Sequence, residues 1–221
     1  MRLRYIGIGL MLIGAVSCSE AERTVDDVEL KHSPEFNMLA AEENIQSVWS
    51  VNLSNIIDDG DFTKLQLGGF GMMVSPILSK MSDPKESGID FTQRTHYATR
   101  VNEKGGFDYS FGCYRVSNRA KVYKMIQSSA GILFGGSRAE KNGFDTYAND
   151  SGIGGAWDEE HLVVVLGGKD RTKDQLVDMA IDILNSRFKD APDNEKLESY
   201  ISLDDDVSCL VDMAKSAKLG Q

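Results

Sequence analysis

Histidine and cysteine, the residues that most often hold metal ions or act as nucleophiles, are scarce in this sequence. Its 221 residues include three histidines and three cysteines. The histidines are His32, His96 and His161, and no two of them are three or four residues apart. A zinc site on one helix needs that spacing. We therefore expect no metal and no other cofactor.

Basic residues are outnumbered by acidic ones. Lys and Arg together number 24 against 34 Asp and Glu, which gives a net charge of -10. A protein of this charge repels a nucleic-acid backbone, so we exclude nucleic acid as a partner. Hydrophobic residues make up 41% of the chain. That share is ordinary for a folded domain and too high for a disordered protein.

The apolar run near the N-terminus is too short to span a membrane. It covers Ile6 to Val16, whereas a transmembrane helix needs about 20 apolar residues. The run follows Arg2 and Arg4 and ends in small residues. This order of basic, apolar and small residues is typical of a secretory signal peptide, which we predict over residues 1–17.

The sequence Ala15-Val16-Ser17-Cys18 resembles the lipobox of bacterial lipoproteins, although Ala15 stands where that motif prefers Leu. The resemblance implies cleavage before Cys18, lipid attached to Cys18, and a protein anchored in the bacterial outer membrane on its periplasmic or cell-surface side. Several acyl chains hold a protein firmly to a bilayer without spanning it. A plain secretory signal that is cut elsewhere is the alternative.

Apolar periodicity predicts the elements of the folded part. We expect strands at 47–53, 96–101, 107–116, 143–148, 153–157 and 161–166. We expect helices at 70–81, after a cap at Ser117 or Asn118, and after a capping box of Thr172 and Gln175. The order is strand, helix, two strands, helix, three strands, helix. It predicts an α+β fold, an antiparallel sheet with helices packed on one face.

The domain boundaries follow from composition. Residues 18–38 are predicted to be a lipidated cysteine and an acidic tether, and residues 40–189 the α+β domain. Charge and proline predict a linker at 190–203. Residues 204–221 are predicted to open an unfinished second unit, because Val207 to Met213 resembles Ser47 to Leu53. On that view Cys209 belongs to a different unit from Cys113, so we expect no disulfide between them.

Three stretches resemble one family of bacterial lipoproteins, known only as a domain of unknown function. They are the first strand with its acid-rich loop, the turn from Glu86 to Asp90, and the run from Ile153 to Asp158. The similarity covers Ala40 to about Phe188. It implies a surface or periplasmic lipoprotein and supplies no catalytic residue.

Other motifs depart from known chemistry. The run from Gly135 to Ala139 is close to a nucleophile elbow but follows a helix end, where the elbow needs a strand. The acidic turns at Asp58–Asp61 and Asp204–Asp206 lack the spacing of a calcium loop, and we interpret them as solvated. A Cys113–His161 pair is conceivable if their strands are neighbours, but a cysteine on an apolar face usually keeps its proton.

These observations favour a membrane-anchored, non-catalytic binding or scaffolding domain whose protein or small-molecule ligand is unknown. The alternative is an envelope or extracellular hydrolase whose residues converge only in the fold. A pocket that holds His96 or His161 beside acids would favour the enzyme. A bare apolar groove would favour binding.

Overall fold

The computed structural model describes residues 30–42, 44–52, 84–127, 136–167, 170–203 and 205–212. The predicted signal peptide, Cys18, the Asp58–Asp61 turn and the predicted helix at 70–81 lie outside these residues. Within the described ranges, no helix has both the length and the apolar character that crossing a bilayer requires.

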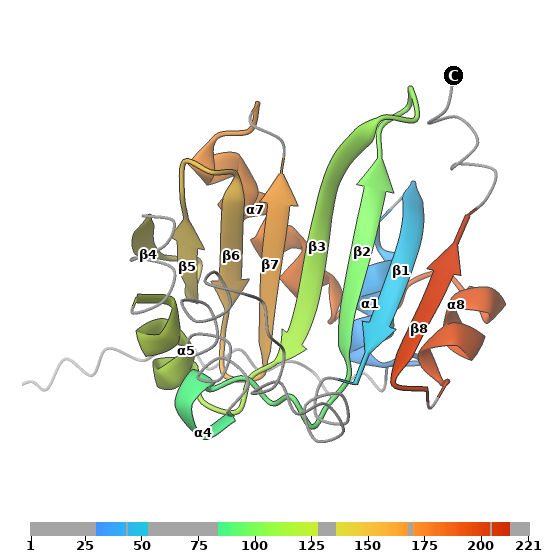
Figure 1. Cartoon of the computed structure of the whole chain (residues 1–221), viewed down its shortest axis with the longest axis horizontal. Helices are drawn as coiled ribbons and strands as arrows, with labels where there is room; N and C mark the ends of the chain where they lie inside the picture. Colours follow the sequence, from blue (N-terminus) through green and yellow to red (C-terminus); the bar gives the residue numbers. More distant parts are fainter. Residues whose placement is uncertain are drawn as a thin grey trace, which may run out of the picture.

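One antiparallel sheet organises the described chain (Figure 1). Its eight strands follow the order β4-β5-β6-β7-β3-β2-β1-β8. The strands are β1 (Ile45–Val51), β2 (Thr95–Val101), β3 (Phe107–Arg115), β4 (Ser137–Lys141), β5 (Phe144–Ala148), β6 (Ile153–Trp157), β7 (His161–Gly167) and β8 (Val207–Val211). The predicted α+β class is confirmed.

Helices cover the sheet unevenly. α1 (Pro34–Ala40), α7 (Lys173–Ser186) and α8 (Glu195–Ile201) lie on one face, which we call the helix face (Figure 1). α4 (Pro84–Ser87) and α5 (Arg119–Met125) lie at one end of the sheet. Val122 of α5 packs with Trp157 and Leu162, which point to the other face. The helix face therefore carries the larger core, and the other face is covered only in part by described residues.

Strand β3 shows how the sequence pattern builds the core. Tyr109, Phe111 and Cys113 alternate along the strand and are all buried on the helix face. Alternation of this kind puts every second side chain on one face of a sheet. Phe107 begins the same pattern but is exposed, next to a register shift between Arg100 and Val101. The predicted half-buried strand is confirmed, except at its first residue.

Close contact between α7 and the sheet depends on a glycine. A Cβ atom at Gly154 of β6 would lie 2.5 Å from the Cβ of Leu176. Only a residue without a side chain lets the helix approach so closely. The predicted capping box starts α7: Gln175 N donates to Thr172 Oγ1 at 3.2 Å, and Thr172 N donates to Gln175 Oε1 at 2.8 Å.

The N-terminal boundary of the fold was predicted wrongly. Residues of the expected tether form α1, which places Phe36, Met38 and Leu39 in the main core. Ser33 caps the helix by accepting a hydrogen bond from Phe36 N at 3.2 Å, and Pro34 occupies the first helical position. Seven residues are too few to show helical periodicity, so the acidic composition around them dominated the prediction.

The predicted linker at 190–203 is also wrong, because it contains α8. Leu197 and Tyr200 of this helix are buried in the main core, and Tyr200 Oη donates to Ser208 O at 2.6 Å. The described part of the supposed second unit is β8, which pairs with β1 in the same sheet through Trp49 and Cys209. Only two buried positions among seven helical residues left no pattern against the surrounding charges.

A leucine pair tests whether α8 belongs to the core. Leu197→Ala should lower the free energy of unfolding by about 2 to 5 kcal/mol, the usual cost of truncating a buried leucine. Leu203→Ala is the matched control, because Leu203 is 43% exposed, and it should change stability by less than about 0.5 kcal/mol. Both values come from urea unfolding curves. Equal, small losses of stability in the two variants would show that residues 190–203 are a linker, as predicted from the sequence.

Candidate functional site

A buried polar cluster lies where α1 crosses the ends of β3 and β7. Glu35 stands in the first turn of α1, and Arg115 and His161 are paired residues of the two strands. Arg115 Nε lies 2.5 Å from Glu35 Oε1, and His161 Nε2 lies 3.2 Å from the same oxygen. The carboxylate therefore fastens the helix to two strands at once.

The protonation states in this cluster follow from its surroundings. Burial acts to raise the pKa of Glu35, but hydrogen bonds from His161 and the backbone, together with the charge of Arg115, outweigh it and lower the pKa to about 2. Burial lowers the pKa of the nearby His96 to about 4, against the pull of Glu35. At neutral pH, Glu35 is therefore charged and His96 is neutral.

A second ion pair, between Asp158 and Arg187, holds the backbone of His161. Burial acts to raise the pKa of Asp158, but hydrogen bonds from Arg187 and from backbone N–H groups lower it. Asp158 Oδ1 accepts from His161 N at 3.0 Å, and its other oxygen accepts from the buried Arg187. His161 is thus held by its backbone as well as by its ring.

The strands of Cys113 and His161 are neighbours, as a Cys113–His161 pair requires, but the two side chains do not form such a pair. β3 and β7 are neighbours, and Cys113 pairs with Val163, two residues from His161 on the same face. Burial, with the charge of Glu35, raises the pKa of the Cys113 thiol well above its ordinary value. No hydrogen bond joins Cys113 to His161 among the described residues. A protonated thiol without a base is a packing residue.

The histidines of this region are closed to solvent, whereas the side chains of Glu35 and Arg115 are 15% and 35% exposed. His161 is 1% exposed and His96 is 3% exposed, and both lie on interior strands of the sheet. Neither lines the groove at β1 and β8 or the one beside Arg171 and Thr172. A histidine beside an acid is therefore present, as an enzyme would need, but the imidazole of His161 is shielded from solvent.

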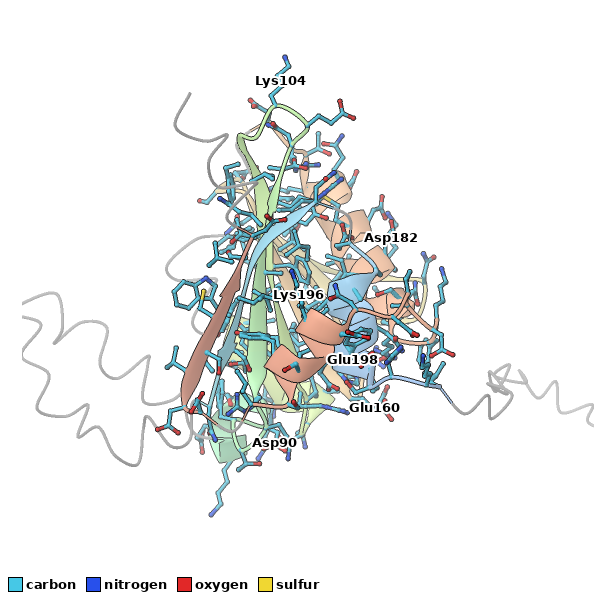
Figure 2. The ribbon with its side chains drawn as sticks, turned by 90° about the vertical axis from the view of Figure 1, so that its right-hand side faces the viewer. Asp90, Lys104, Glu160, Asp182, Lys196 and Glu198 are labelled. Atoms are coloured by element: carbon cyan, nitrogen blue, oxygen red, sulfur yellow. The ribbon has the colours of Figure 1, made fainter. Side chains whose placement is uncertain are left out.

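An open groove lies at the other end of the sheet, between α1 and α8 on one side and β1 and β8 on the other. Its volume is about 590 Å³. Apolar side chains from all four elements line it, and three charged residues stand among them. The lining residues that carry this description are Leu39, Val48, Leu197, Leu210, Glu42, Lys196 and Asp212. Figure 2 shows α8, with Lys196 and Glu198, beside the edge strand β8.

Glu42 connects this groove to the core. Its Oε2 accepts a hydrogen bond from Tyr109 Oη at 2.5 Å. Burial and the Glu42 carboxylate raise the pKa of Tyr109, so the phenol stays neutral and donates. Arg100 and Arg171 stack over the Tyr109 ring at 5.4 Å. One wall of the groove is therefore held in place by hydrogen bonding and by cation–π contact.

A histidine and two acids near the start of α1 resemble a ligand set for a metal ion. His32, Asp193 and Glu198 offer atoms within 4.8 Å of one another. However, the carboxylates face opposite ring nitrogens: Asp193 lies 3.1 Å from Nε2 and Glu198 lies 3.4 Å from Nδ1. Lys31 Nζ also lies 2.5 Å from Asp193. We interpret the group as an ion-pair network that ties the entry of α1 to α8.

Sequence reasoning missed both sites. Glu35 lay in the expected tether and α8 in the expected linker, so neither was considered as part of a site. Ser33-Pro34-Glu35 is a local signal of a helix start, with a cap, a proline and an acid in order. The groove has no signal in the sequence, because its walls come from opposite ends of the chain. The Gly135–Ala139 run falls partly outside the described residues, and Ser137 begins β4.

Comparison with known proteins adds little. No family model matches the chain, and neither does any curated protein. Crystal form III of a protein named TP0453 is similar with a TM-score of 0.45 and 9% identity, over 80% of this chain and 62% of that one. Form IV gives 0.45 and 11%, over 76% and 60%. The chain thus spans about three fifths of the length of those structures.

The two described cysteines test whether the polar cluster is closed. Both are free, with Cys113 buried and Cys209 exposed. Iodoacetamide should therefore modify Cys209 readily in the folded protein. Cys113 should react more slowly by a factor on the order of 1000, because it becomes accessible only when the structure opens. Mass mapping of the digested protein at successive times gives both rates.

Denaturant supplies the control, since both thiols should then react at similar rates. Equal rates in the folded protein would show a path from solvent to the Cys113–His161 region. That result would favour the hydrolase.

Proposed function

We propose that this chain is a lipid-anchored protein of the bacterial cell envelope that binds a partner without catalysis, at the end of the sheet formed by β1 and β8. One observation carries the choice of binding over catalysis. The histidine–acid cluster is closed, with His161 1% exposed, whereas the groove at β1 and β8 is open.

The groove has the character of a recognition site. Its volume of about 590 Å³ falls within the range of roughly 300 to 1,000 Å³ that is typical of ligand sites. Apolar residues supply contact area, and Glu42, Lys196 and Asp212 supply charges of both signs around it. No described groove residue is a histidine or a cysteine. The lining suits a bound segment or small molecule better than a reaction.

Anchoring to the membrane is supported by the N-terminal pattern. Arg2 and Arg4, the apolar run and the Ala15-to-Cys18 ending match the order of a lipoprotein signal. With the lipid on Cys18, the protein is held at the outer membrane, on its periplasmic or cell-surface side. The net charge of -10 includes Arg2 and Arg4 of the predicted signal peptide, so the mature part is more acidic still and stays soluble beside an anionic surface.

An envelope hydrolase is the second candidate, because His161 does lie beside Glu35. For catalysis α1 would have to move, since Glu35 belongs to that helix and is bonded to Arg115 as well. Arg115 is 35% exposed, so water offsets part of the cost of breaking this pair, but Glu35 would also lose its contact with the buried His161. The contacts of Glu35 therefore favour the arrangement in which α1 stays on the sheet and covers His161.

Replacement of the lipidation residue tests the anchor. In a Gram-negative host fed an alkyne-labelled fatty acid, Cys18→Ala should remove the label and leave the precursor uncut. Cys209→Ala is the matched control and should keep both label and processing, because Cys209 is an exposed thiol of the folded part. Label and membrane fraction are read from the same gel. Equal label in Cys18→Ala and the unaltered protein would refute lipidation at this residue.

A further inference from the structure

The geometry points to a peptide-binding edge: we propose that the free side of β8 adds an extended peptide with basic ends as a further antiparallel or parallel strand. This inference rests on the proposed binding role and names the chemistry of the partner. Strand addition of this kind takes affinity from the main chain and specificity from alternate side chains.

The register of β8 shows which of its backbone groups face away from β1. Asn52 N donates to Asp206 O, and Asp212 N donates to Gln46 O, each at 2.7 Å. In an antiparallel pair the inward-facing groups recur at every second residue. Ser208 and Leu210 therefore face β1 along with Asp206 and Asp212. The N–H and C=O groups of Val207, Cys209 and Val211 face away from the sheet.

Helix α8 does not use these outward groups. Tyr200 Oη donates to the carbonyl of Ser208, which belongs to the inward set. Figure 2 shows α8 lying beside β8 on the helix face, with the strand at the side of the molecule turned to the viewer. Among the described residues, no strand pairs with the outer side of β8.

The two edges of the sheet differ in how they are protected. β4 has the sequence Ser-Arg-Ala-Glu-Lys, and its charged residues Arg138, Glu140 and Lys141 guard that edge. β8 has the sequence Val-Ser-Cys-Leu-Val, with no charge. Charged side chains are a common defence of an edge strand against pairing with another chain. The charged sequence of β4 therefore protects one edge of the sheet, whereas β8 carries no charged side chain and has no outer partner strand among the described residues.

An apolar strip runs beside the open edge on the face opposite α8. Val207 is 51% exposed, Trp49 45% and Val211 41%. Trp49 pairs with Cys209, and Val51 pairs with Val207, so these side chains are neighbours on one face of the two strands. We call Trp49, Val51, Val207, Cys209 and Val211 the β8 strip. Alternate side chains of an added strand would lie against it.

Charge decides between a second copy and another peptide. Asp205 and Asp206 precede β8 and Asp212 follows it, and all three are exposed. Two copies paired antiparallel through β8 would bring these acids together, and like charges repel in such an interface. Arg94 stands near one end of the strand, where it donates to the carbonyl of Asp205 and to Ser50 Oγ. A peptide with lysine or arginine at both ends meets opposite charge instead.

The probe is a fluorescein-labelled peptide of sequence KKTVTVTVKK, titrated with the full-length chain and followed by fluorescence anisotropy. It has a β-forming centre and two lysines at each end. EETVTVTVEE has the same centre and should bind at least about tenfold more weakly, because it meets Asp205, Asp206 and Asp212. KKTVPVTVKK lacks one N–H and should also bind at least about tenfold more weakly, since proline interrupts a ladder.

A matched pair of variants locates the binding on β8. Cys209→Pro removes an outward N–H and leaves the inward bonds to β1, a position at which an edge strand tolerates proline. It should weaken binding of KKTVTVTVKK at least about tenfold, a loss of one strong ladder contact. Cys209→Ala keeps the N–H and removes only the thiol, one side-chain contact of the β8 strip, so it should weaken binding far less than Cys209→Pro does. A thermal melt of both variants verifies that the fold is retained.

If Cys209→Pro unfolds the protein, a double variant takes its place. Asp205→Asn with Asp212→Asn removes two exposed charges without changing the backbone of β8. It should reduce the preference for the lysine peptide over the glutamate peptide at least about fivefold, because the attraction is electrostatic. An unchanged preference in this folded variant would contradict the charge argument.

Three outcomes would contradict the proposal that β8 binds a peptide. The first is no binding of KKTVTVTVKK to the folded protein. The second is binding that Cys209→Pro leaves intact and that Ile45→Arg abolishes, because Ile45 also lines the groove. That result keeps the proposed binding role but moves the site. The third is a mass in light scattering that doubles with concentration and falls on Cys209→Pro, which identifies a second copy as the occupant. Failure of the binding role itself would show separately, as rapid alkylation of Cys113.

Discussion

The antiparallel pairing of β1 with β8 is the contact on which the rest of the structure depends. It joins a strand near the start of the folded chain to one near its end, with Trp49 opposite Cys209. α8 precedes β8 and inserts Leu197 and Tyr200 into the same core that α1 enters with Phe36 and Leu39. Loss of this pairing would remove one side of the groove and uncover the helix face beside Val48. Pairing between two segments that are far apart in the sequence therefore determines both the core and the groove.

The two polar regions of the molecule have opposite physical roles. Glu35 lies against both Arg115 and His161, so its carboxylate fastens α1 to β3 and β7. The pair with Arg115 is partly exposed to solvent, and its main effect is to fix the position of the helix. At the β1–β8 end, Glu42, Lys196 and Asp212 remain beside open space. A binding domain needs a rigid framework and exposed polar groups, and the two ends of this sheet supply one each.

Strand positions could be predicted from the sequence where alternation was strong. β3 has three buried residues in alternation on one face, and the capping box of α7 is a local motif that needs no tertiary information. α1 and α8 were missed because each has seven residues, and their apolar positions have meaning only against a core built elsewhere. β4 was missed because its charged sequence lacks alternation, which is the property that protects it as an edge.

The candidate site was beyond prediction for a related reason. The histidines were recognised, but their burial depends on α1, which composition assigned to a tether. The similarity between Val207–Met213 and Ser47–Leu53 predicts the start of a second unit. The strands in these two stretches instead pair within one sheet, since strands of similar apolar pattern suit one another as neighbours. The pattern was informative, but the sequence could not distinguish repetition from pairing.

The central claim is that β8 is bonded on its inner side and open on its outer side. Amide hydrogen exchange, read residue by residue by NMR on the protein without peptide, measures this directly. The amides of Ser208 and Leu210 should exchange at least about 100-fold more slowly than those of Cys209 and Val211, because only the former bond to β1. Equal protection of all four would show that another strand already occupies the edge. Equal, rapid exchange of all four would show that β8 does not pair with β1, and the account would be wrong.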